Sequence, residues 1–161
     1  MHVRLLTVAD AGVYRALMLH AYTAAPDAFT STPDERAAEP RAEGRAQARR
    51  VGAELVGAVA MEYADKPKTR HKAHLIGMFV KESARGHGAG FELVKAALAH
   101  ARDVKRALTV GLTVTEGNDP AIRLYTAAGF EPWGVEPMAV RVDDGFKGKV
   151  HMSCRLEAPQ A

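Results

Sequence analysis

The sequence predicts an α/β layered domain built on a mixed β-sheet. Two observations predict this class. Apolar and polar residues alternate at 108–115 and again near the end of the chain, which is the two-residue period of strands. Between such segments, 91–102 carries apolar residues at three- and four-residue spacing, which is the period of a helix covering a sheet.

The first elements are a strand and two helices. Residues 3–6 form a short apolar strand candidate, and Thr7 with Asp10 three positions later is an acidic variant of a helix-start pattern. The helix is expected to end before Pro26, and Ser31-Thr32-Pro33 starts a second, shorter one. We expect the apolar stripe of the first helix to comprise Val13, Ala16, Leu17, His20 and Ala21.

The middle of the chain supplies a hairpin and a central strand. Residues 46–63 are strand-like on both sides of a plausible turn at 52–54. Residues 74–80 are apolar at almost every position, which favours a strand buried on both faces, and a helix over 91–102 follows.

The last third predicts a strand at 108–115, a helix that opens at Asp119-Pro120 and stops at Gly129, and a closing hairpin. In that hairpin Met138, Val140 and Val142 lead into a long loop over 143–149. The residues expected to return as its inward face are Val150, Met152, Cys154 and Leu156.

Composition limits the classes of function. The chain has 161 residues with 47% hydrophobic content, enough for one core and one domain, and its net charge of +3 defines no nucleic-acid surface. The basic run at 41–50 is interrupted and holds no aromatic residue to stack on bases, so no nucleic-acid partner is expected. The single cysteine favours a reducing compartment, and neither signal peptide nor membrane span is expected, so we expect a cytoplasmic protein without a membrane partner.

A glycine-rich segment between the central strand and its helix is the strongest chemical signal. Arg85-Gly86-His87-Gly88-Ala89-Gly90 exposes backbone amides where a helix begins, and such amides together with the helix dipole attract an anion. Arg85 adds a permanent positive charge, so a diphosphate suits the loop. The spacing excludes a P-loop, and Phe91 breaks the dinucleotide-binding pattern that would start at Gly86.

A second motif follows the next predicted strand: Asn118, then Ala121, Leu124-Tyr125 and Gly129-Phe130. In their order and separation, the two motifs resemble those of the GNAT superfamily of N-acetyltransferases, and the resemblance covers nearly the whole chain. It implies a mostly antiparallel mixed sheet with helices on both faces, in one domain over 1–161. Its parts would be an acceptor-side region (1–45), an acetyl-coenzyme A core (74–130) and C-terminal strands (131–157).

The resemblance also implies an activity. It implies transfer of acetyl from acetyl-coenzyme A to a primary amine of a small molecule or peptide, with Tyr125 protonating the departing thiolate. The alternative is a sensor of the same fold that binds acyl-coenzyme A without catalysis. Residues implied to bind the coenzyme are Met78, Phe79, Val80, Arg85, Gly86, His87, Gly88, Ala89, Gly90, Asn118, Ala121 and Tyr125.

Three matters stay open. The base that deprotonates the amine could be Glu62, His74, Glu116 or water, since each of these residues is at or near a predicted strand end. No metal is expected, because His71 and His74 would face opposite sides of a strand. Exposed strand edges and the resemblance make a homodimer possible.

Overall fold

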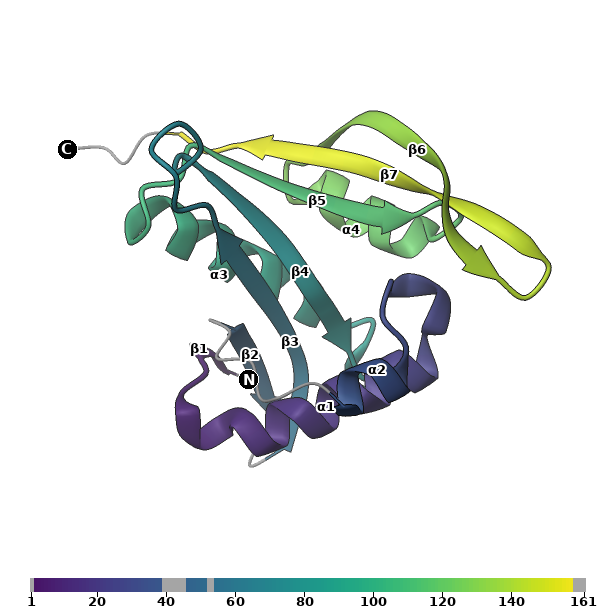
Figure 1. The fold of residues 1–161 in the computed structure, drawn as a ribbon. Helices are drawn as coiled ribbons and strands as arrows, with labels where there is room; N and C mark the ends of the chain where they lie inside the picture. Colours follow the sequence, from purple (N-terminus) through teal and green to yellow (C-terminus); the bar gives the residue numbers. More distant parts are fainter. Residues whose placement is uncertain (1, 39–45, 52–53, 158–161) are drawn as a thin grey trace.

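The structure is a computed structural model that describes residues 2–38, 46–51 and 54–157. The described strands form one seven-stranded sheet in the order β1-β2-β3-β4-β5-β7-β6 (Figure 1). Every neighbouring pair is antiparallel except β4 and β5. The strands are β1 (His2–Leu5), β2 (Ala46–Val51), β3 (Glu54–Tyr63), β4 (Lys72–Val80), β5 (Thr109–Thr115), β6 (Glu131–Val142) and β7 (Gly145–Arg155).

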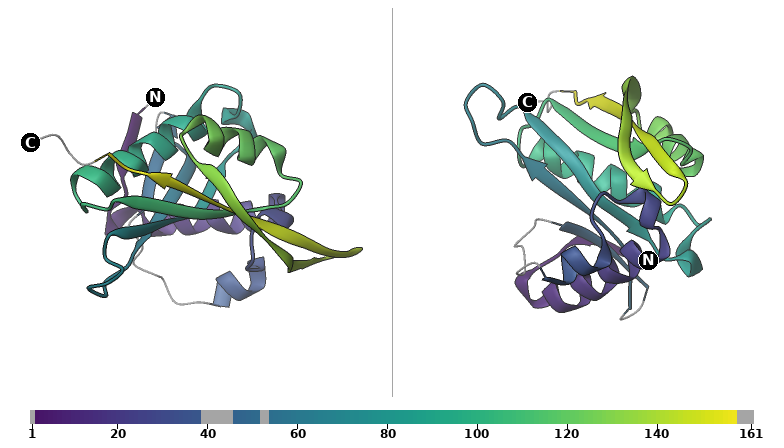
Figure 2. Two further views of the ribbon diagram at one scale, coloured as in Figure 1. Left: turned by 90° about the horizontal axis from the view of Figure 1, so that it is seen from above. Right: turned by 45° about the vertical axis from the view of Figure 1, so that its right-hand side comes forward.

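Helices cover both faces of the sheet, as predicted. On one face lie α3 (Ala89–Asp103) and α4 (Asp119–Ala127) (Figure 2). They enclose the larger core, which includes Leu93, Leu112 and Phe130. On the other, α1 (Ala11–Ala24), with α2 (Pro33–Ala38) packed on it, encloses a smaller core. Among the described residues, no helix is both long and apolar enough to cross a membrane.

The buried stripe of α1 differs from the prediction. Leu17 and Ala21 are buried as expected, but Val13, Ala16 and His20 are exposed. Met18 and Tyr22 are buried in their place. These two side chains offer more apolar surface than valine and alanine, so the helix is turned about its axis to bury them.

The closing hairpin has a shorter connection than predicted. Val142 pairs directly with Gly145, so the turn holds only Asp143 and Asp144, and the loop expected over 143–149 is wrong. Gly145 has a φ of 141°, which only glycine adopts readily and which lets the chain reverse here.

The preceding strand, β5, also starts slightly later than expected. Leu108 lies before β5 and is 51% exposed. The three apolar residues that follow it at alternate positions, Val110, Leu112 and Val114, are buried as predicted.

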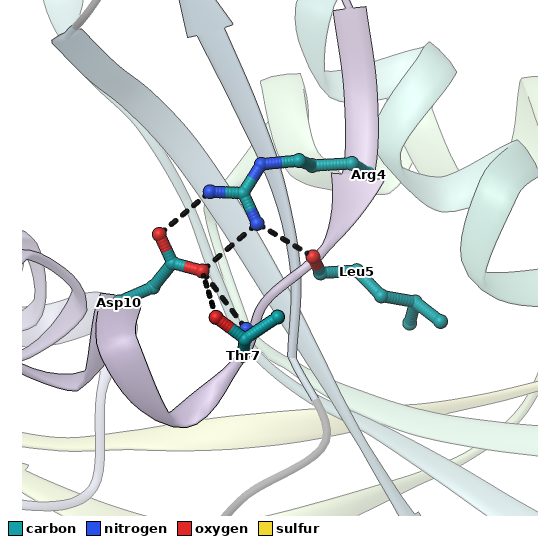
Figure 3. Close-up of polar contacts among 4 residues, drawn as sticks. All are labelled: Arg4, Leu5, Thr7 and Asp10. Carbon is teal, nitrogen blue, oxygen red and sulfur yellow. Dashed lines mark hydrogen bonds and ion pairs between the residues drawn. The ribbon is translucent and has the colours of Figure 1, made fainter.

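An ion pair fixes the start of α1 against the edge strand β1 (Figure 3). The Arg4 guanidinium donates two hydrogen bonds to the Asp10 carboxylate, at 2.8 and 2.6 Å. Asp10 also accepts from the backbone amide and the hydroxyl of Thr7, both at 2.9 Å. The Asp10 side chain thus serves the helix start that its spacing from Thr7 predicted, in the 3₁₀ turn Val8–Asp10 that precedes α1.

This network predicts how stability depends on pH. Hydrogen bonds from Arg4 and then from the Thr7 backbone hold the pKa of Asp10 well below its ordinary value. A depressed carboxyl pKa stabilises the fold above the unfolded pKa of about 3.9, and this stabilisation is lost as the pH falls further. Asp10→Asn should therefore lower Tm by a constant amount between about pH 5 and 8, with the difference shrinking below about pH 4.

Thermal unfolding across pH checks this prediction. Asp103→Asn is the control, because Asp103 pairs with its exposed neighbour Arg102 and should matter little. An Asp10→Asn variant as stable as the parent at pH 7 would contradict the role of the network.

Candidate functional site

The strands β4 and β5 separate in the middle of the sheet. Their parallel ladder joins Lys72 to Thr109, Ala73 to Val110 and His74 to Gly111, and goes no further. Beyond these pairs the two strands diverge (Figure 1). The facing edges of 75–80 and 112–115 therefore carry main-chain groups without a strand partner, and an extended ligand can bind such groups by adding to the sheet.

A β-bulge lies within the divergent part of β4. Between Ala58 and Ala60 of β3 the register shifts, so that β4 contributes one extra residue around Gly77. Gly77 has a φ of 57°, in the left-handed region typical of such bulges. The extra residue changes which face each side chain occupies: Leu75 lies in the core beneath α3, whereas Phe79 lies in the core beneath α1.

The end of β4 directs its main chain towards the gap between the strands. The Lys81 amide donates to the Val56 carbonyl of β3 at 2.8 Å, so by strand alternation the groups of Val80 point away from β3. The side chain of Arg85 confirms this direction, because its Nε donates to the Val80 carbonyl at 3.0 Å. Its guanidinium also lies 5.8 Å from the centre of the Phe79 ring, which places a positive charge where the strands have separated.

The glycine-rich turn leads from β4 into α3. Gly86 and Gly88 have φ values of 79° and 75°, and a Cβ at either would meet no atom within 4 Å. The amide ladder of α3 begins with Glu92, which donates to the Gly88 carbonyl at 3.0 Å. In the described chain nothing accepts from the amides of 86–91, so they form the kind of cradle that binds a phosphate.

His87 lies within this turn and faces back onto it. Its Nδ1 is 2.9 Å from the Arg85 carbonyl, which can only accept, so Nδ1 carries the proton. This contact stabilises the shape of the turn.

Gly90 is the point where β4, α3 and α4 meet. A methyl group at this position would lie 3.2 Å from the side chains of both Met78 and Leu124. Glycine therefore permits close packing of the two helices against the strand. Since Met78 belongs to β4 and Leu124 to α4, the two sequence motifs lie side by side in space.

Asn118 and Ala121 form the N-terminus of α4. The Asn118 side chain accepts a hydrogen bond from the Ala121 amide at 3.4 Å and so caps the helix. Its NH₂ group has no partner among the described residues and could donate to a ligand. This assigns Asn118 a structural role in addition to the predicted binding role.

Tyr125 lies on α4 with its ring in the larger core. The residue is 6% exposed, and its ring packs edge-on against Phe130 at 5.8 Å. Burial raises the pKa of Tyr125 well above its ordinary value, so the phenol keeps its proton at neutral pH. Within the described chain the hydroxyl has no hydrogen-bond partner and is not sealed from solvent, so it can donate to a ligand.

The three candidate bases separate into two places. Glu62 and His74 are directly opposite on β3 and β4, and His74 is also in the last residue pair between β4 and β5. Burial lowers the pKa of half-buried His74, while the Glu62 carboxylate opposes the shift. Glu116 lies beyond the end of β5, where it accepts from the Gly148 amide at 3.3 Å. Only His74 lies where the strands begin to part.

Two features of the site were missed by reasoning from sequence. The bulge has a recognisable signal, since an isolated glycine inside an apolar strand is typical of one. The burial of Lys149 on β7 has no recognisable signal in the sequence. The residue is 93% buried, although lysine is rarely buried unless it is paired.

Comparison with solved structures shows that this fold is shared with acetyltransferases. A ribosomal-protein-alanine N-acetyltransferase from Brucella melitensis matches with a TM-score of 0.79 at 21% identity, covering 97% of this chain and 100% of that one. The yncA protein of Salmonella typhimurium, solved with its cofactor acetyl-CoA, matches with a TM-score of 0.81 at 16% identity, covering 100% and 96%. A GNAT-family acetyltransferase from Streptococcus pneumoniae matches with a TM-score of 0.81 at 18% identity, covering 96% and 99%.

The chain thus has the fold of these acetyltransferases. The acetyltransferase (GNAT) family model matches residues 13–130, and the chain belongs to this family. A comparison with curated proteins found no match.

The glycine turn yields a prediction about acetyl-coenzyme A. Gly88→Ala should reduce affinity for acetyl-coenzyme A at least tenfold. At the left-handed φ of Gly88 an alanine is strained by about 1–2 kcal/mol, and the backbone rotation that relieves this strain would turn the amides away from a phosphate. Calorimetric titration of the coenzyme measures this directly.

Gly145→Ala is the matched control. It introduces the same methyl group at another glycine of positive φ with open space around it, in the β6–β7 turn. It should lower Tm without changing coenzyme affinity. Equal loss of affinity in both variants would contradict a role for the turn in binding.

Proposed function

We propose that this protein transfers acetyl from acetyl-coenzyme A to a primary amine of a small molecule or peptide, by direct attack while both are bound. The observation that carries the proposal is the parting of β4 and β5 beside a glycine-rich turn whose amides have no acceptor in the described chain. A gap of this kind suits an extended arm, and the turn suits the diphosphate at its end. The acetyl-CoA complex of the yncA protein, which shares the fold, supports the choice of donor.

The residues fit this donor in two groups. The amides of 86–90 and the Arg85 charge would hold the diphosphate. The main chain of Met78 and Val80 and the Asn118 amide group would hold the arm, whereas the main-chain groups of Phe79 face β3; Ala121 leaves room at the start of α4. Tyr125 would then face the thioester sulfur.

The proposed reaction needs one acid, one base and one oxyanion donor. The neutral amine attacks the thioester carbonyl, a C–N bond forms and the C–S bond breaks. The Val80 amide, directed into the gap, stabilises the developing oxyanion; the main-chain groups of Phe79, by alternation, point towards β3 instead. Tyr125 gives its proton to the thiolate, and the base takes the proton of the amine.

His74 is the base that the geometry favours. It lies at the root of the gap, and its lowered pKa keeps it neutral at pH 7. The bulge at Gly77 is three residues further along, about 10 Å at the rise of a strand, so a water molecule relays the proton. Glu116 is less suitable, because its carboxylate is engaged by Gly148.

Two further expectations concern the setting of the enzyme. A homodimer is supported by the apolar surface of the edge strand β6, where Trp133, Val135 and Met138 are all more than half exposed. A cytoplasmic location is supported by the single, free cysteine, Cys154, and by the supply of acetyl-coenzyme A.

A thiol-release assay over a panel of primary amines tests the proposed function. The parent should release coenzyme A only with an amine present, and Tyr125→Phe should lower kcat about a hundredfold or more, because general acid catalysis contributes that much. Affinity for acetyl-coenzyme A should stay within about twofold.

Tyr22→Phe removes the same hydroxyl from the core beneath α1 and should leave kcat unchanged. Coenzyme binding without turnover on any amine would favour the sensor alternative. Unchanged kcat in Tyr125→Phe would remove its assigned role.

The pH profile tests His74. Because the pKa of His74 is lowered, the rate should reach its plateau below the ordinary histidine value of about 6.5. His74→Gln should lower kcat at least tenfold at pH 7 and abolish this limb. Glu62→Gln removes a charge that raises the pKa and should move the limb to lower pH.

His71→Gln is the control, since His71 is exposed and precedes β4. A His74→Gln profile identical to that of the parent would show that water or another group is the base.

A further inference from the structure

Lys149 is a largely buried residue whose ammonium nitrogen still reaches solvent, and the proposed reaction has no use for it. It is 7% exposed and lies on β7, opposite Thr115 of β5. Its main chain pairs with β5 and β6, but no group of the described chain forms an ion pair or hydrogen bond with its ammonium. Burial of most of the residue removes part of the hydration of the ammonium, so an anion beside it would stabilise its charge.

The neighbouring carboxylates are already engaged. Glu136, opposite Lys149 on β6, meets His151 at 3.3 Å. Glu116 accepts from the Gly148 amide, and Asp27 accepts from Lys147 at 2.8 Å. Burial lowers the pKa of Lys149, with only Glu136 acting in the opposite direction. An additional anion would therefore stabilise the charged form.

Lys149 lies on the face of the sheet opposite α3 and α4. Its neighbours in sequence at 150, 152 and 154 pack into the core beneath those helices, so by alternation Lys149 points to the other side. Thr115, its partner on β5, confirms this side, because its hydroxyl donates to the Asp27 carbonyl at 2.6 Å in the segment after α1. The glycine turn leads into α3, so Lys149 is not placed to bind the coenzyme diphosphate.

Lys149 is also level with the reactive part of the gap. Gly111 is the last residue of β5 that pairs with β4, and Thr115 lies four residues further on. That position is level with the part of β4 that follows Gly77. One strand separates Lys149 from the gap, about 5 Å away laterally. An acceptor that offers its amine to the gap from this face would bring its other end near Lys149.

We propose that Lys149 binds an anionic group of the acceptor, so that the substrate class is an amine carrying a carboxylate, as in an amino acid. The inference rests on the proposed function and deepens it. A carboxylate gives the ammonium the partner that the protein withholds, and it orients the amine towards the gap. An amine without an anion leaves Lys149 uncompensated and binds less well.

Matched acceptor pairs test the proposal. Phenylalanine, methionine and lysine are compared with phenethylamine, 3-methylthiopropylamine and cadaverine, which lack only the carboxylate. The parent should show at least tenfold higher kcat/KM for the carboxylate-bearing member of each pair it acetylates. Lys149→Met should remove this preference by raising KM for the amine that carries the carboxylate. For the amine without a carboxylate, kcat/KM should be unchanged or higher.

Two variants separate binding from structure. Lys149→Arg should restore much of the preference, because it restores the charge. Lys95→Met removes the charge of an exposed side chain on α3 and should leave the carboxylate preference unchanged. A parent without carboxylate preference, or a Lys149→Met variant that loses activity equally on both members of a pair, would overturn the proposal.

Binding measurements that do not depend on turnover separate a failure of the proposed function from a failure of the proposed role of Lys149. Acetyl-coenzyme A that fails to bind or to react with any amine refutes the proposed function. N-acetylphenylalanine and N-acetylphenethylamine are then titrated into the parent and into Lys149→Met. Tighter binding of the carboxylate compound to the parent alone supports the role of Lys149, and equal binding of both compounds refutes it.

Discussion

Three residue pairs join β4 to β5, and the strand edges left unpaired beyond them are where we propose that the ligand binds. A sheet that is antiparallel everywhere else changes direction at this single parallel neighbour. The connection between the two strands contains α3, so one side of the gap ends in a helix N-terminus. Unpaired strand edges and unpaired helix amides are thus brought together by the same short ladder.

The two faces of the sheet divide the proposed work. The coenzyme side is built from the turn at 85–88, α3 and α4, and it supplies backbone amides. The acceptor side is bordered by α1 and the Asp27 segment, and it holds His74 and Lys149. Acetyl transfer through the gap would join two sites that share no side chain.

Much of the fold followed from local patterns in the sequence. The period-two strand predicted at 108–115, which the structure has at 109–115, the helix after Asn118 and the glycine turn were predictable because neighbouring residues alone determine them. The buried face of α1 was missed, because it depends on what the sheet offers to the helix. The burial of Lys149 was missed for the same reason: strand pairing from β6 and β5 encloses it, and those contacts are distant in sequence.

The bulge at Gly77 has a consequence for how the protein can vary. The extra residue reverses which face of the sheet the odd-numbered side chains of β4 occupy. Leu75, before the bulge, therefore packs into the core beneath α3, and Phe79, after it, packs into the core beneath α1. Deleting that residue would exchange the inward and outward sides of everything up to the turn. An insertion or deletion of one residue in this strand would therefore move the following side chains to the other face of the sheet. Such a change would alter the packing of both cores at once.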